Sequence, residues 1–324
     1  DMTDKQIKNY FNMTALGFLA YAVLLQILAV IVVVLFSIAF PDLSSDSMYY
    51  SMMVAVVPCM LFLHFLFQNS NLPSLRVNPV NIEETESDSM DLEEKSFSPL
   101  VFLHYFLIFC GVQWISSLLT MPLVFLFQKI GMDLSYSEMA AKGGALDNIP
   151  MLIYTVLFAP VVEELVFRGI FYKRFKAFGA FFTAFASSLF FALIHSNFLQ
   201  FIPAFMMGFV LFSIRDRYGL RYSILLHLTN NALAIVVNNL GGSRLWVLSA
   251  YGLILLAGTV YALVNLVKNR TNLSSFLPGE EEQKNLRLFF RSPVLWFDIL
   301  ILVVLAIVIM MNPGAGAGDM ATTV

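Results

Sequence analysis

Uncharged apolar runs recur along this chain of 324 residues, and they constrain its fold more than any other feature. A run of about 18 apolar residues is long enough for a helix to span roughly 30 Å of hydrocarbon. Only 13% of the residues are charged, about half the share found in soluble globular proteins. The sequence therefore predicts an all-α fold, a polytopic transmembrane helical bundle that forms a single integral membrane domain over residues 1–324.

The apolar runs predict about eight to nine membrane spans. The candidates are Ala15–Phe40, Tyr49–Phe67, a span within Pro99–Phe127, Pro150–Phe175, Phe181–His195, Phe198–Ile214, Tyr222–Leu240, Leu245–Val267 and Val294–Met311. The polar stretches 69–98 and 268–293 are expected to be solvated loops, and residues 129–149 a loop or a partly re-entrant connection. Residues 313–324, which follow the last span, are expected to form a flexible tail.

Positive charge gathers on one side of this arrangement. With nine spans and a cytoplasmic N-terminus, fifteen Lys and Arg residues fall inside and three outside. Cytoplasmic loops carry an excess of these residues, so we expect a cytoplasmic N-terminus and cytoplasmic loops at 69–98 and 268–293. The basic residues form no continuous face, which argues against a nucleic-acid partner. Cys59 and Cys110 lie in apolar runs and give neither a disulfide framework nor a metal-binding spacing.

The fourth candidate span, Pro150–Phe175, carries three charged residues: Glu163, Glu164 and Arg168. Charge at bilayer depth is unfavourable, so such residues are candidates for function. Arg168 follows Glu164 by four positions, which places the two side chains on one helix face, where they can pair. Glu163 is turned about 100° away on the helix. The spacing therefore predicts a fixed, ionised Glu164 and a Glu163 that is free to face a cavity; a purely structural ion pair is the alternative.

The remaining candidate spans contain few polar side chains that could complete a site. His64 and His104 occur singly in apolar runs and are expected to be packing or interfacial groups. Asp298 lies near the cytoplasmic end of the ninth span, where it is expected to reach the membrane interface.

Two further pairs have the four-residue spacing that places side chains on one helix face. Phe191 and His195 form the first pair, and His227 and Asn231 the second. A buried carboxylate can act as a general base, imidazole can share the proton transfer, and a His or Asn donor can stabilise an oxyanion. Together with Glu163, these side chains supply what the hydrolysis of an amide by water requires.

The three motifs, in this order on successive apolar helices, resemble those of the CPBP family. They are EExxxR at Glu163, Glu164 and Arg168, FxxxH at Phe191 and His195, and HxxxN at His227 and Asn231. This family, also called Abi, comprises CAAX-prenyl-protease and bacteriocin-processing membrane proteins. The resemblance covers a CPBP-like catalytic core of roughly residues 100–240. It implies an intramembrane endopeptidase of the bacterial cytoplasmic membrane, acting on a membrane-associated or lipidated peptide or protein.

By carry-over from the family, Glu163 would activate water with the help of His195, while His227 and Asn231 would bind the oxyanion. The supporting residues of the site would be Glu164, Arg168 and Phe191. The family has been described both as metalloproteases and as metal-free glutamate proteases. Glu163, His195 and His227 could form a three-ligand zinc site, but the chain has no HExxH motif. The sequence favours a reaction without an obligatory metal and leaves zinc open.

Counting 1.5 Å per helical residue places His195 at a different membrane depth from Glu163 and His227. We therefore expect the fourth helix to extend beyond Phe175, or the fifth helix to be bent or re-entrant. The site is expected in a cavity open towards the cytoplasm.

Two other functions stay open at this point. A non-catalytic membrane scaffold or immunity protein could use the same fold to bind a partner, although erosion of the motifs would then be expected and none is eroded. A proton-coupled transporter could also use intramembrane carboxylates and histidines, but the chain shows no internal repeat. Expected partners are the substrate, membrane lipids and a protein that binds the cytoplasmic loops.

Overall fold

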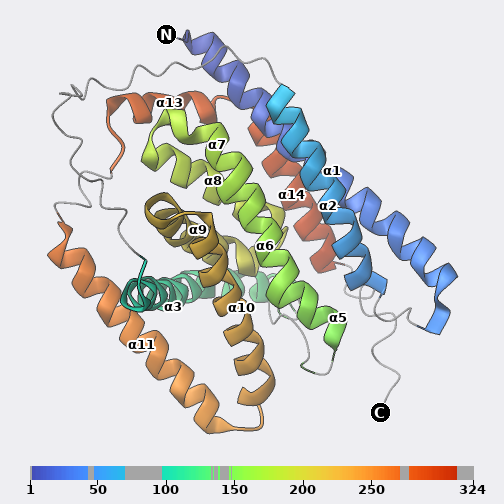
Figure 1. Cartoon of the computed structure of the whole chain (residues 1–324), viewed down its shortest axis with the longest axis vertical. Helices are drawn as coiled ribbons and strands as arrows, with labels where there is room; N and C mark the ends of the chain where they lie inside the picture. The colour runs from blue at the N-terminus through green and yellow to red at the C-terminus, as the bar shows by residue number, and fades with distance from the viewer. Residues whose placement is uncertain are drawn as a thin grey trace.

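The computed structural model describes residues 2–42, 47–69, 97–132, 148–270 and 277–311, together with residues 134, 138 and 146. The regular elements in these ranges are all helical (Figure 1). In chain order they are α1 (Asp4–Ala39), α2 (Ser47–Asn69), α3 (Pro99–Lys129), α5 (Ile149–Leu152), η2 (Ile153–Phe158), α6 (Ala159–Glu164), η3 (Leu165–Phe171), α7 (Tyr172–Phe175), η4 (Lys176–Phe178), α8 (Ala180–Ile194), α9 (Phe198–Tyr218), α10 (Leu220–Gly241), α11 (Leu245–Lys268), α13 (Glu280–Phe290) and α14 (Pro293–Met311).

The all-α polytopic bundle is confirmed, and the chain is an integral membrane protein. Seven of the described helices are long and apolar enough to cross a membrane, and an eighth span results if α13 and α14, bent by 62° at their junction, count as one. Helix α1 begins well before the predicted Ala15, because Thr3 and Gln6 form a capping box at its start. The expected 268–293 loop contains helix α13. The predictions for residues 70–96, for most of 129–149 and for the tail fall outside the described residues.

The fifth predicted span is the element that differs most from expectation. Helix α8 has 15 residues, which give a length of only about 22 Å against roughly 30 Å of hydrocarbon. The preceding helical segment, Ile149–Phe178, does continue past Phe175, which is the first of the two alternatives that the depth count left open. The α8 N-terminus is held by Glu282 of α13, whose carboxylate accepts a hydrogen bond from the Phe181 N–H at 3.0 Å. A short α8 brings His195, at its C-terminal end, into the interior of the bundle.

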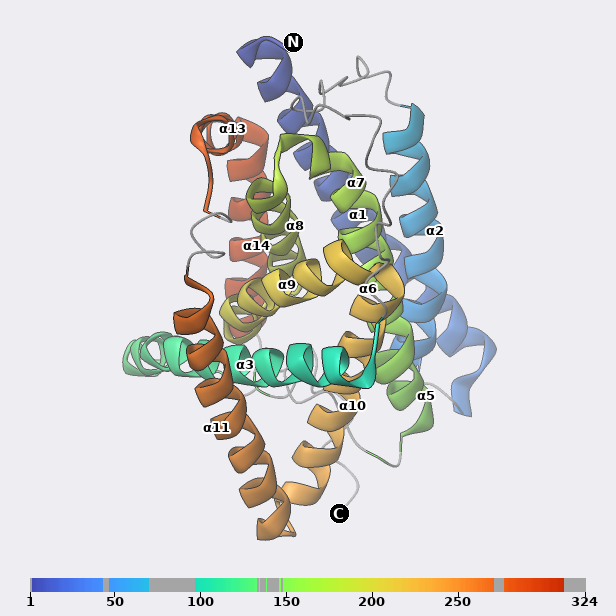
Figure 2. The same ribbon diagram turned by 60° about the vertical axis from the view of Figure 1, so that its left-hand side comes forward.

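Two buried clusters hold the bundle together. The larger lies among α1, α2, the Ile149–Phe178 segment, α8, α13 and α14, and the smaller lies among α3, α9 and α10. In Figure 2, α1, α2, α6, α8 and α14 stand upright, whereas α3 and α9 run across them. The larger cluster is rich in phenylalanine rings, which pack at centroid distances such as 4.5 Å for Phe18 and Phe190. The elements that carry the motif residues are therefore fixed on several sides.

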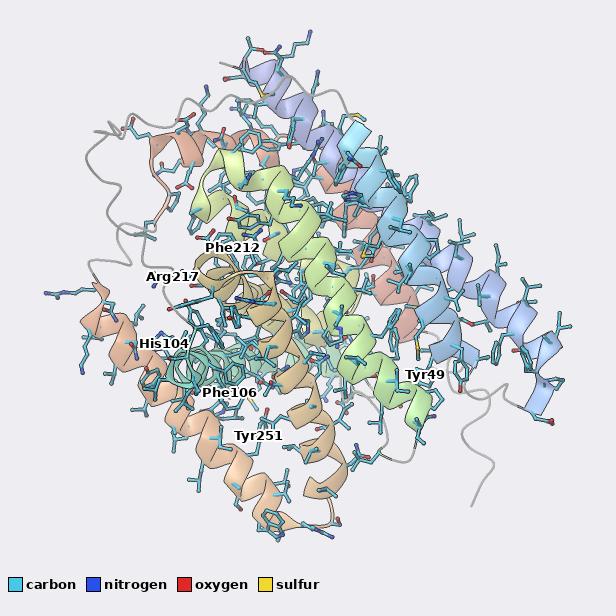
Figure 3. All side chains as sticks on the ribbon, viewed as in Figure 1. Tyr49, His104, Phe106, Phe212, Arg217 and Tyr251 are labelled. Atoms are coloured by element: carbon cyan, nitrogen blue, oxygen red, sulfur yellow. The ribbon has the colours of Figure 1, made fainter. Side chains whose placement is uncertain are left out.

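Two of the minor polar predictions can be compared with the structure. His104 was expected to be a packing or interfacial group, and its Nδ1 lies 2.7 Å from the Tyr261 hydroxyl where α3 meets α11; Figure 3 shows it there, at a distance from Tyr49. Asp298 was expected to reach the membrane interface, and that prediction is wrong. Its side chain is fully buried, and neither carboxylate oxygen has a hydrogen-bond partner among the described residues.

Candidate active site

Glu164 is the centre of a buried polar network. Its Oε1 accepts a hydrogen bond from Arg168 Nη1 at 3.1 Å, which confirms the pairing predicted from the spacing. The same oxygen accepts a second hydrogen bond from His227 Nδ1 at 3.0 Å. Both members of the ion pair are fully buried. A buried charge is tolerated when it is paired and hydrogen-bonded in this way, so the network fixes the α6–η3 segment to α10.

Arg168 extends the network from η3 to α8 and α9. Its Nη2 donates to the Gly208 carbonyl at 3.3 Å, and its guanidinium lies 4.3 Å from the centroid of the Phe191 ring. A Cβ atom at position 208 would lie 2.5 Å from the Ser188 hydroxyl and 3.1 Å from Arg168 Nη2. Glycine is therefore required for this close approach of α8, α9 and the guanidinium.

Phe191 packs between the two histidines of the predicted site. Its ring meets His195 edge-on at 5.1 Å and His227 edge-on at 5.8 Å. Phe191 thus contacts the cation and both imidazoles, and it holds them at fixed relative positions. The sequence named Phe191 as a supporting residue, and its ring contacts the cation and both imidazoles.

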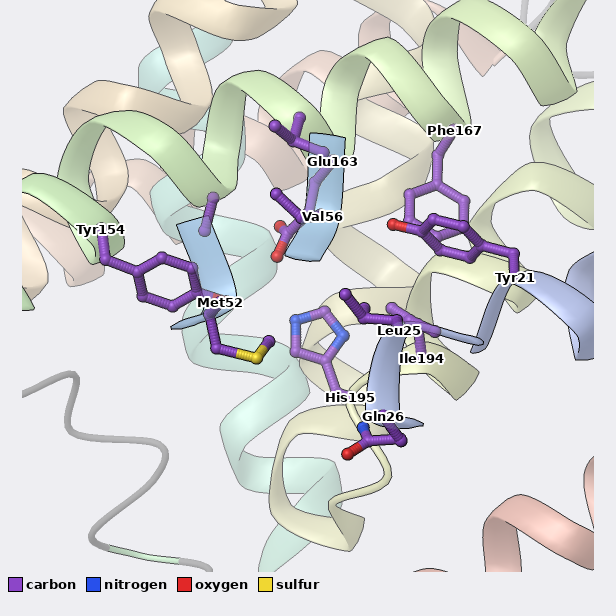
Figure 4. Close-up of a pocket in the computed structure, with 12 residues that line it drawn as sticks. Tyr21, Leu25, Gln26, Met52, Val56, Tyr154, Glu163, Phe167, Ile194 and His195 are labelled. Carbon is purple, nitrogen blue, oxygen red and sulfur yellow. The ribbon is translucent and has the colours of Figure 1, made fainter. Parts of the chain in front are cut away.

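Glu163 and His195 line one cavity, as Figure 4 shows, with the carboxylate of Glu163 pointing towards the imidazole. The cavity has a volume of about 180 Å³. The Glu163 side chain is 27% exposed, and its Oε2 lies 3.6 Å from His227 Nε2, which is longer than a hydrogen bond. Glu163 makes no hydrogen bond to the described part of the chain. Its carboxylate is therefore available to a bound water or substrate.

The orientation of His195 is set by the end of α8. Its Nδ1 lies 2.8 Å from the Phe191 carbonyl oxygen. Because a carbonyl can only accept, Nδ1 carries the hydrogen, and Nε2 of the neutral ring keeps its lone pair. The next residue, Ser196, has a φ of 46°, a left-handed conformation that is uncommon for residues other than glycine. The chain therefore leaves α8 immediately after His195. Because Nδ1 is occupied by the Phe191 carbonyl, the imidazole can accept a proton only at Nε2.

Asn231 is hydrogen-bonded to the helical segment that carries Glu163. Its Nδ2 donates to the Thr155 carbonyl at 2.9 Å, and its Oδ1 accepts from Asn230 Nδ2 at 3.3 Å. Thr155 lies in the π-helical η2, five residues before Pro160. Proline has no N–H to donate, so the carbonyl one turn earlier needs another donor, and Asn231 supplies it. Neither His227 nor Asn231 is among the residues that line the cavity.

A zinc site would need at least three ligating side chains gathered at one point. In the described ranges, no group of three or more His, Cys, Asp or Glu side chains is arranged to hold a metal ion. The suggested ligands Glu163, His195 and His227 do not form such a group. His227 directs one ring nitrogen to Glu164 and the other to Glu163. The reaction proposed below uses only side chains of the chain.

Three polar residues of the cavity were missed from the sequence: Tyr21, Gln26 and Tyr154. Tyr154 precedes Glu163 in the same helical segment, whereas Tyr21 and Gln26 come from α1, outside the region of the motifs. A signal for Gln26 was present, since a lone amide within an otherwise apolar span is itself unusual. Met52 and Val56 of α2 complete the apolar part of the wall.

Comparison with family models gives one match on this part of the chain. Residues 145–233 match the model described as "Type II CAAX prenyl endopeptidase Rce1-like". The matched range contains all three motifs and ends before α11. Comparison with curated proteins and with solved structures gave no match.

Proposed function

Through residues 145–233 the chain belongs to the CPBP family of CAAX-type intramembrane endopeptidases, and on that premise we propose that it hydrolyses a peptide bond in a membrane-associated or lipidated peptide or protein. One observation carries the proposal. Glu163 and His195 line the same cavity, and both keep atoms that can take a proton. The neighbouring carboxylate, Glu164, is meanwhile occupied by Arg168 and His227. Two adjacent glutamates thus have separate tasks.

The reaction begins with Glu163 as general base. Its carboxylate accepts a proton from a water molecule in the cavity while the water oxygen forms a bond to the carbonyl carbon. The electron pair of the C=O bond moves to the oxygen and gives a tetrahedral oxyanion. The C–N bond then breaks, and the leaving nitrogen takes the proton from Glu163, which restores the carboxylate. His195 Nε2, which holds a lone pair, shares this proton during the transfer.

His227 and Asn231 are proposed to stabilise the oxyanion. His227 donates to Glu164 through Nδ1 and presents Nε2 to the Glu163 side of the site. In the proposed role the ring is the imidazolium, in which Nε2 also carries a hydrogen and can donate it to the oxyanion. Asn231 has a second amide N–H besides the one that Thr155 accepts. The Glu164–Arg168 pair acts as a positioning unit, because its charge is neutralised internally and its hydrogen bonds fix His227.

We also propose a metal-independent glutamate mechanism and a cytoplasmic N-terminus in a bacterial cytoplasmic membrane. The peptide or lipidated-protein substrate would reach the cavity from the membrane or the cytoplasmic side, and membrane lipids would surround the bundle. A protein partner would bind through the polar loops 69–98 and 268–293. Nucleic acid is not among the proposed partners.

The test is proteolysis by the purified full chain in detergent. Wild type and Glu163→Gln are incubated with a panel of fluorogenic peptides, farnesylated and unprenylated, with and without a chelator. Cleavage by wild type alone is expected, and it should survive the chelator. Equal cleavage by both forms would overturn the role of Glu163, and loss of cleavage in chelator that zinc restores would overturn the metal-free mechanism. The scaffold function would be favoured by two results together: wild type cleaves no peptide of the panel, and a partner protein co-purifies equally with wild type and Glu163→Gln.

A further inference from the structure

Helix α1 contributes a tyrosine hydroxyl to the cavity that the family motifs do not account for. The Tyr21 side chain is only 3% exposed, and Figure 4 shows it on the wall of the cavity that holds Glu163 and His195. No hydrogen bond joins its hydroxyl to any described residue. Buried tyrosine hydroxyls usually find a partner. The Tyr21 hydroxyl is not among the fully buried unpaired atoms of the described residues, so it opens onto the cavity beside Glu163, where a substrate can supply its partner.

The oxyanion proposed above needs donors that are already in place. The Asn231 amide is tied to Thr155, and Nδ1 of His227 is tied to Glu164. Tyr154 also lines the cavity, but it is less buried than Tyr21 and its ring packs against Tyr49 at 6.3 Å. Tyr21 is therefore the most enclosed O–H donor on the cavity wall.

Tyr21 is also held rigidly. One turn earlier on α1, a Cβ atom at Gly17 would lie 2.5 Å from the Phe67 ring, so α1 and α2 touch at this height. Phe18 packs against Phe190 of α8 at 4.5 Å and against Phe171 of η3 at 6.1 Å. Helix α1 is thus packed directly on the two elements that lead to His195 and Glu163. Hydrogen-bond donors that are fixed in place before the reaction lower the free energy of the transition state most.

We propose that Tyr21 is a further catalytic residue, whose O–H donates a hydrogen bond to the scissile carbonyl oxygen and to the oxyanion formed from it. The inference rests on the proposed function. Tyr21 transfers no proton: the proton of the attacking water passes to Glu163 and then to the leaving nitrogen, while the phenol stays protonated throughout. Its hydrogen bond shortens and strengthens as negative charge develops on the oxygen.

The test compares Tyr21→Phe with wild type on a fluorogenic peptide that wild type cleaves, from the farnesylated and unprenylated panel. Because the hydroxyl acts on the transition state, kcat should fall about 100-fold while KM stays within about twofold. The melting temperature should stay that of wild type, since the ring and its packing are kept. Tyr50→Phe is the matched control, because Tyr50 lies on α2 away from the cavity lining and stacks on Phe36; its kcat should not change.

The possible results separate the two proposals. If Glu163→Gln is inactive and Tyr21→Phe keeps a wild-type kcat, the role of Tyr21 is overturned and the proposed function stands. If Tyr21→Phe loses activity together with melting temperature, or through KM alone, Tyr21 is a packing or binding residue and the inference is likewise overturned. If Glu163→Gln cleaves like wild type, or if wild type cleaves nothing in the panel, the premise fails and the inference fails with it.

Discussion

The Nδ1 atom of His227 lies 3.0 Å from Oε1 of Glu164, an oxygen that also accepts a hydrogen bond from Arg168. This contact joins α10 to the α6–η3 segment and turns Nε2 of His227 towards Glu163 at 3.6 Å. The position of the HxxxN histidine relative to the second glutamate of EExxxR is therefore set through one carboxylate oxygen. The adjacent Glu163 faces the cavity instead, so neighbouring positions on one helix have different surroundings.

Glu164→Gln should destabilise the protein, because it leaves the guanidinium of Arg168 buried without a counter-charge. We expect a loss of about 3 kcal/mol in the free energy of unfolding, measured by denaturation in detergent. The double variant Glu164→Gln with Arg168→Met removes both charges and should lose less than the sum of the two single variants. Strict additivity would contradict the pairing.

Glu163→Gln should have the opposite effects. Its side chain borders the cavity and makes no hydrogen bond to the described residues, so the melting temperature should stay within about 2 °C of wild type. The rate of peptide hydrolysis should fall by about 10³-fold or more, because a general base is lost. Glu164→Gln is the matched comparison one residue away. A Glu163→Gln variant that unfolds as readily as Glu164→Gln would show that the two carboxylates share a structural role.

Asn231→Ala should reduce stability as well as activity. It leaves the Thr155 carbonyl without a donor inside the bundle, a change expected to cost about 1–3 kcal/mol. Pro160→Ala returns an N–H to the helix and should reduce that cost when it is combined with Asn231→Ala. The unfolding free energies of the two single variants and the double variant check this. No coupling between positions 160 and 231 would show that the Asn231–Thr155 bond does not compensate for the proline.

Asp298→Asn should stabilise the protein. The Asp298 carboxyl is fully buried on α14, and neither oxygen has a hydrogen-bond partner among the described residues. A neutral amide of the same shape removes a buried ionisable group, and we expect a rise of about 2–4 °C in melting temperature. Asp4→Asn is the contrasting variant, because Asp4 is exposed and pairs with Lys284 at the surface; it should change the melting temperature little. An unchanged or lower melting temperature for Asp298→Asn would show that the carboxyl has a partner outside the described residues.

The sequence predicted the class of fold and the ion pair at the centre of the site. The fold class could be predicted because the length of an apolar run indicates whether it can span a membrane. The ion pair could be predicted because the spacing from Glu164 to Arg168 is a local property of one helix. Properties that depend on contacts between helices could not be predicted from the sequence. The short α8 has an ordinary apolar composition, so only its neighbours show that it ends inside the bundle. The bond from Asn231 to Thr155 depends on the π-helical turn before Pro160, which no spacing rule predicts.

The same limit explains why Tyr21 and Gln26 were missed. They lie more than 130 positions before Glu163 in the chain, and the motifs pointed only to residues 100–240. A residue can be assigned to a cavity from sequence only when the packing of its helix is known. The contact of α1 with α8 and η3, which places Tyr21 at the cavity, is a property of the folded bundle.

The position of α1 on the cavity wall has an evolutionary consequence. The charged residues of the site lie within residues 145–233, the region that matches the family model, while one side of the cavity is built from helices before it. Under the proposed function, the proton-transfer residues and one wall of the substrate chamber are therefore encoded in separate parts of the gene. Under that function, mutations at Leu25, Met52 or Val56 would change which peptides enter the chamber and leave the proton-transfer residues and Tyr21 untouched, so new specificities can arise while the catalytic groups are kept.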